Sequence, residues 1–528
     1  MGVLKKIKNF LLRGDSSNKI DIVFILASLS TYSVLTFMTI SNFAFGFDES
    51  YSAYVIKHSY FDVAKYMTTD LNSPLHYWLL KFWSSIFGSS EAALRSLSLV
   101  FGALAIFVAF LLVKKLFGKA IARLSVIFLS ISPMIIGYGQ EARMHMMALF
   151  FGVLATYLLV VALGSKKKLH WALYGISVGL SILTHYMFIL IPIAHLVWRI
   201  VEYKKSTGKI KGFLSPEWVI AIIACISTML LWLPFMISQF IVLESKGFWV
   251  PAFSIKNIVD FICEIFTYRL VDWSTGWVAV GVMFIIIFSI VSLLKMLARS
   301  DKLLKLNLKL IVFSALLPVL CLILLSLPPL SSCFIDRYLL FSVFLIPVLV
   351  SVAILNRFIK INPIFRLLVI GIVIVISVIG VNNVRQVGNN NQSSNIINQG
   401  KNIMVNISNV DNQSCPVIVN TPRLFYELEY YAKYGNKVYF IDNDSYYDIG
   451  FFNILKDDND HKIVNLNKFT NSVKCFWYVV PVYSQYDVLE NQEKPSQNWR
   501  VLNSFSITYP TTGETQYRAV KYEVINKD

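Results

Sequence analysis

The chain has 528 residues, of which 56% are hydrophobic and only 15% are charged, and its mean hydropathy is +0.60. Soluble domains carry about 25% charged residues, so this composition excludes an ordinary soluble protein and predicts a polytopic membrane protein. The formal net charge of +17 would suit a nucleic-acid-binding protein. However, the basic residues are divided among short loops and form no single basic face, so we expect no nucleic acid partner.

Apolar segments long enough to cross a bilayer, about 20 residues each, recur along the first 384 residues. We expect about eleven α-helical spans, with the fifth and sixth divided near His185. Residues 1–384 are therefore predicted to form a transmembrane domain. The expected spans are 21–43, 93–113, 120–138, 144–163, 169–186, 187–201, 217–240, 276–295, 308–328, 338–356 and 364–383.

Basic residues cluster in alternate loops between these spans. Because Lys and Arg concentrate on the cytoplasmic side of short loops, the alternation predicts a cytoplasmic N-terminus and an extracytoplasmic tail after Val384. The first span has no small-residue cleavage site, so we expect no cleavable signal peptide. The clusters begin at Lys5, Lys114, Lys166, Arg199, Lys295 and Arg357.

The loop after the first span opens with an acidic pair, Asp48-Glu49. A carboxylate is costly inside a bilayer and ordinary beside it, so the pair is a candidate site on the outer face. The loop, which runs to about residue 92, is too long for a simple connection. Its pattern predicts two interfacial helices, Ser50–Tyr66 and Leu75–Phe87, which would lie in the membrane plane.

The polar residues of the other outer turns fall on the same predicted face as the acidic pair. Gln140, Glu141 and Arg143 follow the third span, His185 and Tyr186 follow the fifth, and Arg337 and Tyr338 begin the tenth. The charges thus gather on one membrane face and avoid the spans.

From Arg385 the composition changes, and residues 385–528 predict a small extracytoplasmic α/β domain. After an Asn-rich linker at 388–398, a helix expected at Pro422–Tyr434 ends at Gly435. Cys415 and Cys475 share this domain, and whether they form a disulfide is left open. The acidic runs at 442–444 and 457–460 favour turns over metal sites. The expected strands are Pro416–Asn420, Lys437–Ile441, Cys475–Pro481 and Tyr517–Ile525.

Four of these patterns together resemble the bacterial branch of the C-type (GT-C) integral membrane glycosyltransferases. That branch includes proteins like the dolichyl-phosphate-mannose–protein mannosyltransferases and the aminoarabinose transferase of lipid A. The resemblance covers the first 190 residues best. The family commonly has His-Pro-Pro-Leu where this chain has Asn72-Ser73-Pro74-Leu75, and His76 is shifted in register. The four patterns are Asp48-Glu49, residues 72–78, residues 138–145 and Arg337-Tyr338.

The resemblance implies a polytopic α-helical fold and transfer of a sugar from a polyprenyl-phosphate-linked donor at the outer face of a bacterial inner membrane. The acceptor would be a protein, lipid A or another surface glycan. Asp48 is the expected catalytic base, and attack by the activated hydroxyl predicts inversion. A divalent metal ion stays open as a cofactor. The further candidates are Glu49 and Glu141 for catalysis, Arg143, Arg337 and Tyr338 for the donor phosphate, and His76, Tyr77, Gln140, His185 and Tyr186 for the acceptor or pocket.

Several of these residues also have a structural alternative. In that alternative, Asp48 merely ends a helix and faces water, Arg337 pairs with Asp336, and His185 hydrogen-bonds between spans. For the whole chain, the main alternative is a multi-pass transporter or a lipid or glycolipid flippase. Transporters often show internal repeats and charges near the midplane, and neither is found here. A third reading is a membrane scaffold that presents the α/β tail.

Overall fold

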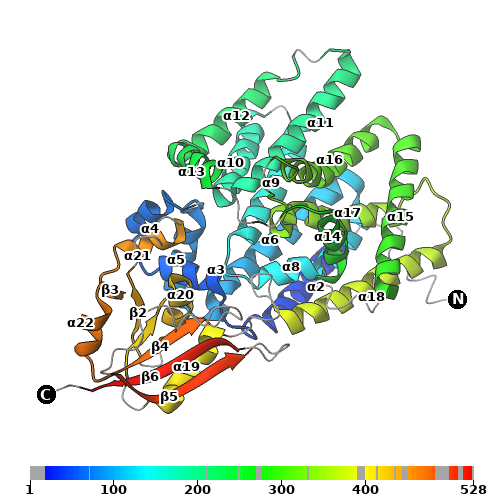
Figure 1. Cartoon of the computed structure of the whole chain (residues 1–528). Coiled ribbons are helices and arrows are strands. Elements are labelled where there is room, and N and C mark those ends of the chain that lie inside the picture. The colour runs from blue at the N-terminus through cyan, green and yellow to red at the C-terminus, as the bar shows by residue number, and fades with distance from the viewer. Residues whose placement is uncertain are drawn as a thin grey trace. The chain divides into compact units, whose positions relative to one another are not determined.

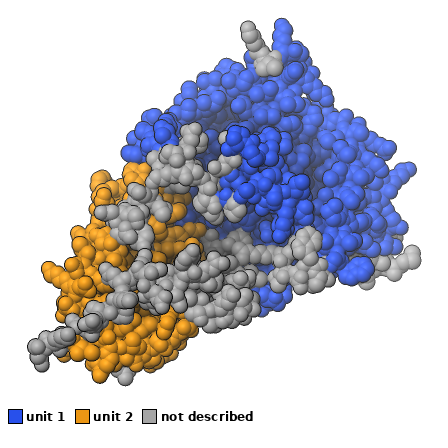
Figure 2. All heavy atoms as spheres, viewed as in Figure 1, with its two compact units in different colours: residues 1–40, 95–389 blue, residues 41–94, 390–528 orange. Residues whose placement is uncertain are grey.

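The computed structural model describes residues 18–70, 72–165, 167–209, 212–246, 250, 252–268, 276–329, 332–388, 399–411, 414–432, 436–442, 450–481, 499–508 and 515–525. The chain divides into two units, each built from two stretches of sequence (Figure 2). Unit 1 comprises Met1–Ile40 and Arg95–Asn389, and unit 2 comprises Ser41–Leu94 and Asn390–Asp528.

Unit 1 is helical (Figure 1). Its elements are α2 (Asn18–Phe37), α6 (Glu91–Phe117), α7 (Lys119–Ser130), α8 (Pro133–Gly139), α9 (His145–Leu163), α10 (Lys168–Thr184), η1 (Tyr186–Ile189), α11 (Leu190–Thr207), α12 (Pro216–Met229), α13 (Leu233–Lys246), α14 (Ile255–Thr267), α15 (Gly276–Arg299), α16 (Lys302–Leu325), η2 (Asp336–Leu339), α17 (Leu340–Ile354) and α18 (Pro363–Val387).

Eight helices among the described residues are long and apolar enough to cross a membrane, and ten if each of two bent pairs is one span. The bent pairs are α7 with α8, at 57°, and α12 with α13, at 77°. Helix α10, with 17 residues, occupies the remaining place where the sequence predicts a span. The break between Thr184 and Tyr186 lies where the fifth and sixth spans were expected to divide. The membrane-protein fold class is confirmed, and the number of crossings stays a prediction.

Helix α17 lies at the centre of unit 1. It packs against α7, α15 and α16, and all of its residues except Ile346 are buried. Large apolar side chains elsewhere are open to the surroundings, for example Leu231 at 90% and Trp277 at 88% exposure. A soluble monomer rarely exposes so extensive an apolar surface, whereas a lipid-facing surface is expected to be apolar.

Helix α14 was not expected from the sequence, which left 241–275 without an element. A capping box between Ser254 and Asn257 begins it. Phe261 and Ile265 are buried, and the helix packs against α8 and α18, while Ile255 is exposed. Its apolar face is therefore covered by unit 1 itself, which is why it forms despite being too short for a span.

Unit 2 joins helices of the first loop to the C-terminal α/β region (Figure 1). Its elements are α3 (Phe47–Val55), α4 (Tyr60–Met67), α5 (Leu75–Phe87), α19 (Gln399–Val410), β1 (Val417–Val419), α20 (Pro422–Tyr431), β2 (Val438–Ile441), η5 (Gly450–Phe452), α21 (Asn453–Lys456), β3 (Lys462–Ile463), α22 (Leu466–Asn471), β4 (Cys475–Pro481), β5 (Trp499–Thr508) and β6 (Thr515–Val524).

The six-stranded sheet has the order β3-β2-β1-β4-β6-β5. Strand β1 is parallel to β2 and β4, and β3 is parallel to β2, whereas β6 is antiparallel to β4 and β5. Ile418 pairs with Tyr439 on one side and Tyr478 on the other. The predicted small α/β domain is confirmed, with β3 and β5 as strands that the sequence did not reveal. The predicted cap at Gly435 and linker residues 389–398 lie outside the described residues.

The prediction of a single helix over Ser50–Tyr66 is wrong. The structure breaks it into α3 and α4, because Ser59 caps a new helix: its Oγ accepts a hydrogen bond of 3.1 Å from the backbone N–H of Asp62. Such a cap satisfies an amide that lacks a partner in the first turn. The helix expected at Leu75–Phe87 is confirmed as α5.

Helices α3 and α4 are fastened to the C-terminal part of unit 2 by polar contacts. Lys57 Nζ lies 2.9 Å from Glu429 Oε1, and Lys65 Nζ lies 2.8 Å from Asp457 Oδ2. The hydroxyl of Tyr54 donates to Asp458. The division at residue 384 stays a prediction as a functional boundary, and the structure adds that Ser41–Leu94 belongs with the tail.

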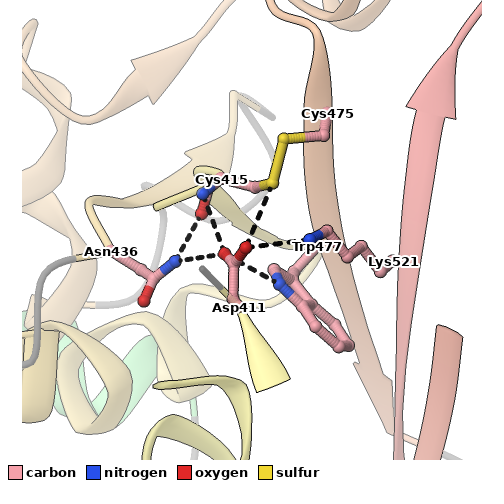
Figure 3. Close-up of a disulfide and its surroundings, with 6 residues drawn as sticks. All are labelled: Asp411, Cys415, Asn436, Cys475, Trp477 and Lys521. Carbon is pink, nitrogen blue, oxygen red and sulfur yellow. Dashed lines mark hydrogen bonds and ion pairs between the residues drawn. A yellow bond between two sulfur atoms is a disulfide. The ribbon is translucent and has the colours of Figure 1, made fainter. Parts of the chain in front are cut away.

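A disulfide between Cys415 and Cys475 joins the segment before β1 to β4, with the two Cα atoms 5.4 Å apart (Figure 3). Beside it, the buried carboxylate of Asp411 accepts hydrogen bonds from Asn436 Nδ2 at 2.7 Å and Lys521 Nζ at 2.8 Å. The backbone N–H of Cys415 and the indole of Trp477 also donate to it, as Figure 3 shows. A buried charge requires such partners, so Asp411 organises the middle of the sheet.

Candidate functional site

The segment between α8 and α9 carries three of the predicted site residues, Gln140, Glu141 and Arg143, and all three are buried. The Gln140 amide donates to the Thr36 carbonyl at 3.1 Å and to Thr39 Oγ1 at 2.6 Å, which fixes the segment against the end of α2. Ser98 on α6 donates to the carbonyl of Arg143 at 3.1 Å. The turn is thus held from two helices.

Two glycines let the turn approach its neighbours closely. A Cβ placed on Gly137 would lie 2.4 Å from Cε2 of Tyr268, and one on Gly139 would lie 2.4 Å from the hydroxyl of Tyr32. Both distances are far below van der Waals contact, so any larger residue would displace the turn. Tyr268 itself is buried and has a positive φ of 69°.

A hydrogen bond connects this turn to η2. The hydroxyl of Tyr138 donates to Asp336 Oδ2 at 3.0 Å. Asp336 is the first residue of η2, so the bond fixes the start of the element that carries Arg337 and Tyr338. The Arg337 guanidinium carbon lies 5.8 Å from the centroid of the Tyr338 ring.

Two histidines complete this arrangement. His145 Nε2 lies 3.9 Å from Glu141 Oε2, and the His145 ring is 5.4 Å from that of His185. The His185 ring is in turn 5.1 Å from that of Tyr338. The guanidinium groups of Arg143 and Arg337 both lie within electrostatic range of His185.

We name these groups the polar cluster of unit 1. It brings together predicted residues from three separate segments of the sequence. Tyr138, His145 and Asp336 were not among the predicted site residues, although Tyr138 and His145 lie in the motif at 138–145 that the sequence singled out. The cluster consists of Tyr138, Glu141, Arg143, His145, His185, Asp336, Arg337 and Tyr338.

The hydroxyl of Tyr186 forms hydrogen bonds with residues that are not part of the polar cluster. It donates to Gln239 at 2.7 Å and accepts from the indole of Trp232 at 2.8 Å. These bonds tie η1 to the bent pair α12 and α13. A role for Tyr186 in an acceptor pocket stays a prediction.

The other predicted residues belong to unit 2. Asp48 and Glu49 lie in the first turn of α3, with Asp48 partly exposed and Glu49 buried. Carboxylates in this position are favoured by the helix dipole, so the structural alternative for the pair has a physical basis too. His76 and Tyr77 are buried in α5, with their rings 5.6 Å apart. Whether these four residues join the polar cluster in catalysis stays a prediction.

Within the described residues, no three His, Cys, Asp or Glu side chains converge as a metal-ligand set. The Glu141 and His145 pair supplies two such groups, at 3.9 Å from one another. Metal dependence stays a prediction.

The fold is shared with solved membrane enzymes. ArnT from Cupriavidus metallidurans in the apo state is 13% identical, with a TM-score of 0.60, and the match covers 95% of this chain and 97% of that chain. ArnT bound to undecaprenyl phosphate is 12% identical, also with a TM-score of 0.60, covering 96% and 98%. The Archaeoglobus fulgidus oligosaccharyltransferase complexed with Zn and sulfate is 13% identical over 87% of this chain and 68% of that chain, with a TM-score of 0.53.

This is the fold of a C-type integral membrane glycosyltransferase, and the resemblance that the sequence motifs indicated is confirmed. More particularly, residues 72–232 match the family described as dolichyl-phosphate-mannose-protein mannosyltransferase. YkcB, a candidate mannosyltransferase of Bacillus subtilis (strain 168), is 26% identical over 170 residues, 32% of this chain. The chain matches only 23% of that relative's length.

Proposed function

We propose that this protein is a glycosyltransferase that moves a sugar from a polyprenyl-phosphate-linked donor to an acceptor on the outer face of a bacterial inner membrane. The observation that carries the proposal is the hydrogen bond from Tyr138 to Asp336, which joins the turn that carries Arg143 to the element that carries Arg337. Guanidinium groups bind phosphate through charge-assisted, often bidentate hydrogen bonds. The fold of this chain is also that of ArnT, which has been solved with undecaprenyl phosphate.

In this proposal, Arg143, Arg337 and Tyr338 hold the donor phosphate. As the bond between the anomeric carbon and the phosphate oxygen breaks, negative charge grows on the departing polyprenyl phosphate. Guanidinium groups that are held in place, Arg143 buried and Arg337 half-buried, stabilise that charge with little reorganisation. The hydrogen bond from Tyr138 to Asp336 supports this role, because it fixes the element from which Arg337 extends.

Asp48 is the proposed base, with Glu49 and Glu141 as the other candidate carboxylates. The base takes the proton of the acceptor hydroxyl while the hydroxyl oxygen attacks the anomeric carbon, and the polyprenyl phosphate leaves. One displacement of this kind inverts the anomeric carbon.

His76, Tyr77, Gln140, His185 and Tyr186 are proposed to line the acceptor side of the site. The acceptor is a protein, lipid A or another surface glycan, and a divalent metal ion is a candidate cofactor that chelation during the assay would test. The proposed topology places the N-terminus in the cytoplasm and the C-terminal region outside, because the basic loops alternate. Accessibility of a C-terminal tag to reagents from outside the membrane tests that topology.

The decisive experiment measures transfer of labelled sugars from undecaprenyl-phosphate donors into membranes that contain the wild-type or a variant chain. Asp48→Asn should lower the rate by at least about a hundredfold, the usual contribution of a general base. Asp460→Asn, which changes an exposed carboxylate of unit 2 in the same way, should leave the rate unchanged. Full activity of Asp48→Asn removes Asp48 from the mechanism. Movement of the donor lipid across vesicles without any glycosylated product would instead identify a flippase.

A further inference from the structure

Unit 2 contains a cleft of about 790 Å³, whose lining includes none of the residues assigned above. It lies between the helices of the first loop and the C-terminal region, and its lining includes Lys57, Ser84, Glu429, Tyr430, Lys437 and His461. Small-molecule sites usually occupy about 300–1,000 Å³, so the cleft has the size of a binding site for a short oligomer. Eight of its eleven lining residues have polar side chains.

One carboxylate lies between two basic groups at this cleft. Glu429 Oε1 is 2.9 Å from Lys57 Nζ, and Glu429 Oε2 is 3.9 Å from His461 Nε2. The Glu429 side chain is 13% exposed, so the pair is sheltered without being sealed from solvent. A group of this kind can accept hydrogen bonds from ligand hydroxyls while its basic neighbours donate.

Contacts with Asp458 and Phe425 fix the orientation of the His461 ring. Its Nδ1 lies 2.9 Å from Asp458 Oδ2, and its ring is 5.5 Å from that of Phe425. Burial acts to raise the pKa of Asp458, but hydrogen bonds from His461 and Tyr54 outweigh it and lower that pKa, so Asp458 stays ionised. The contact between Nδ1 and Asp458 orients the ring so that its other nitrogen, Nε2, lies 3.9 Å from Glu429 Oε2.

The remaining polar groups of the lining come from opposite sides. Ser84, Ser89 and Ser90 belong to the first loop, and Tyr430 is anchored there because its hydroxyl donates to the carbonyl of Ser89 at 2.9 Å. Lys437, an exposed residue directly before β2, adds a second ammonium group. The lining thus offers two ammonium groups and an imidazole against one carboxylate, together with hydroxyls and a fixed aromatic ring.

We propose that this cleft binds an anionic saccharide, meaning a short sugar chain that carries carboxylate or phosphate groups. Hydroxyls and a carboxylate match sugar hydroxyls, and the excess of basic groups matches the anionic substituent. The assignment of a saccharide rests on the proposed glycosyltransferase function, and it names the class of acceptor that unit 2 would hold.

The test is direct binding to the purified full-length chain in detergent, measured by isothermal titration calorimetry. Tetragalacturonate serves as the anionic probe, maltotetraose as the neutral probe of equal length, and inorganic phosphate as the small anion. We expect tetragalacturonate to bind more tightly than either of the others and to weaken as salt is raised. Lys437→Gln should reduce its affinity about tenfold, the effect of losing one charge-assisted hydrogen bond.

Lys468→Gln is the matched control, since it removes an exposed lysine of α22 in the same unit and should not change affinity. Asp48→Asn should retain binding, so a failure of catalysis and a failure of this proposal are distinguishable. Two results would overturn the proposal: tetragalacturonate binding no better than maltotetraose or phosphate, or unchanged affinity in Lys437→Gln and in His461→Gln.

Discussion

Tyr138 and Asp336, 198 residues apart in the sequence, are joined by a hydrogen bond of 3.0 Å from the tyrosine hydroxyl to Oδ2. One belongs to α8 and the other begins η2, so the bond relates the turn that carries Arg143 to the turn that carries Arg337. We therefore infer that Tyr138, which is uncharged, helps to position the two arginines of the proposed phosphate site.

Replacing Tyr138 tests this relationship. Tyr138→Phe keeps the ring and removes the donor, so we expect undecaprenyl phosphate to bind about tenfold more weakly, because a hydrogen bond to a charged group is worth about 1.5 kcal/mol or more. Tyr157→Phe, at a half-buried tyrosine of α9, should bind as the wild type does. Equal affinity in Tyr138→Phe and wild type would contradict the positioning role. Binding of labelled lipid to the purified chain measures the effect.

Gly137 tests the close approach of α8 to Tyr268. In Gly137→Ala the new Cβ would lie 2.4 Å from the ring, so we expect a loss of about 1–3 kcal/mol in stability and a lower melting temperature. The double variant Gly137→Ala/Tyr268→Ala should lose less stability than the sum of the two single losses, since the two residues share one contact. Gly371→Ala in α18, where nothing lies within 4 Å of the new atom, should be neutral or slightly stabilising. A normal melting temperature for Gly137→Ala would refute the close packing.

The buried carboxyl of Glu427 should make the stability of unit 2 depend on pH. Burial, which outweighs the opposing effect of Arg423, raises the pKa of Glu427 from 4.5 to about 7. Between these pH values the folded state holds a proton that the unfolded state has released, so stability should fall as pH rises from about 4.5 to about 7. The fall is at most about 3 kcal/mol.

Thermal unfolding of the full chain at pH 5 and pH 8 measures this effect. Glu427→Gln should melt at a higher temperature than wild type at pH 8 and show a weaker pH dependence. Glu523→Gln, which alters an exposed glutamate paired with Arg500, should keep the wild-type dependence. A Glu427→Gln variant with an unchanged pH profile would show that this carboxyl does not titrate as described.

The disulfide gives a prediction that needs no substrate. Thiol titration of the unfolded, unreduced chain should find four free thiols among six cysteines. Reduction should destabilise unit 2 by about 4 kcal/mol, since the bond joins residues 60 apart and restricts the unfolded chain. A Cys415→Ser/Cys475→Ser chain should be insensitive to reductant, whereas Cys333→Ser should respond as the wild type does. Six titratable thiols would exclude the bond.

Local patterns predicted much of the fold, because hydropathy and turn residues act over short distances. Each expected span corresponds to a helix or a bent pair, and Leu75–Phe87 and Cys475–Pro481 match α5 and β4. The short strand β3 and the strand β5 were missed, since β3 has two residues and β5 exposes apolar side chains such as Val501 at the sheet edge. The break between α3 and α4 was missed because the Ser59 cap was not recognised.

Contacts between residues far apart in the chain could not be predicted from the sequence. The motif at 138–145 was recognised, yet its connection to Asp336 depends on how α8 and η2 pack, which no local pattern encodes. The same holds for Tyr54 with Asp458 and for Lys57 with Glu429, which link the first loop to the tail across some 400 residues. The pairing of Cys415 with Cys475, which the sequence left open, also depends on long-range packing, because a sequence gives no distance between Cα atoms.

Unit 2 has a further consequence for how this protein is made. Its first part, Ser41–Leu94, leaves the ribosome about 300 residues before its second part begins at Asn390. At about 5–20 residues per second, the early helices wait roughly 15–60 s for α20 and the sheet against which they fold. During that interval Phe47, Tyr51 and Tyr54 have none of their ring partners from the tail. The nascent chain therefore carries an exposed aromatic surface for most of its synthesis, and a chaperone that shields it until termination would raise the yield of folded protein.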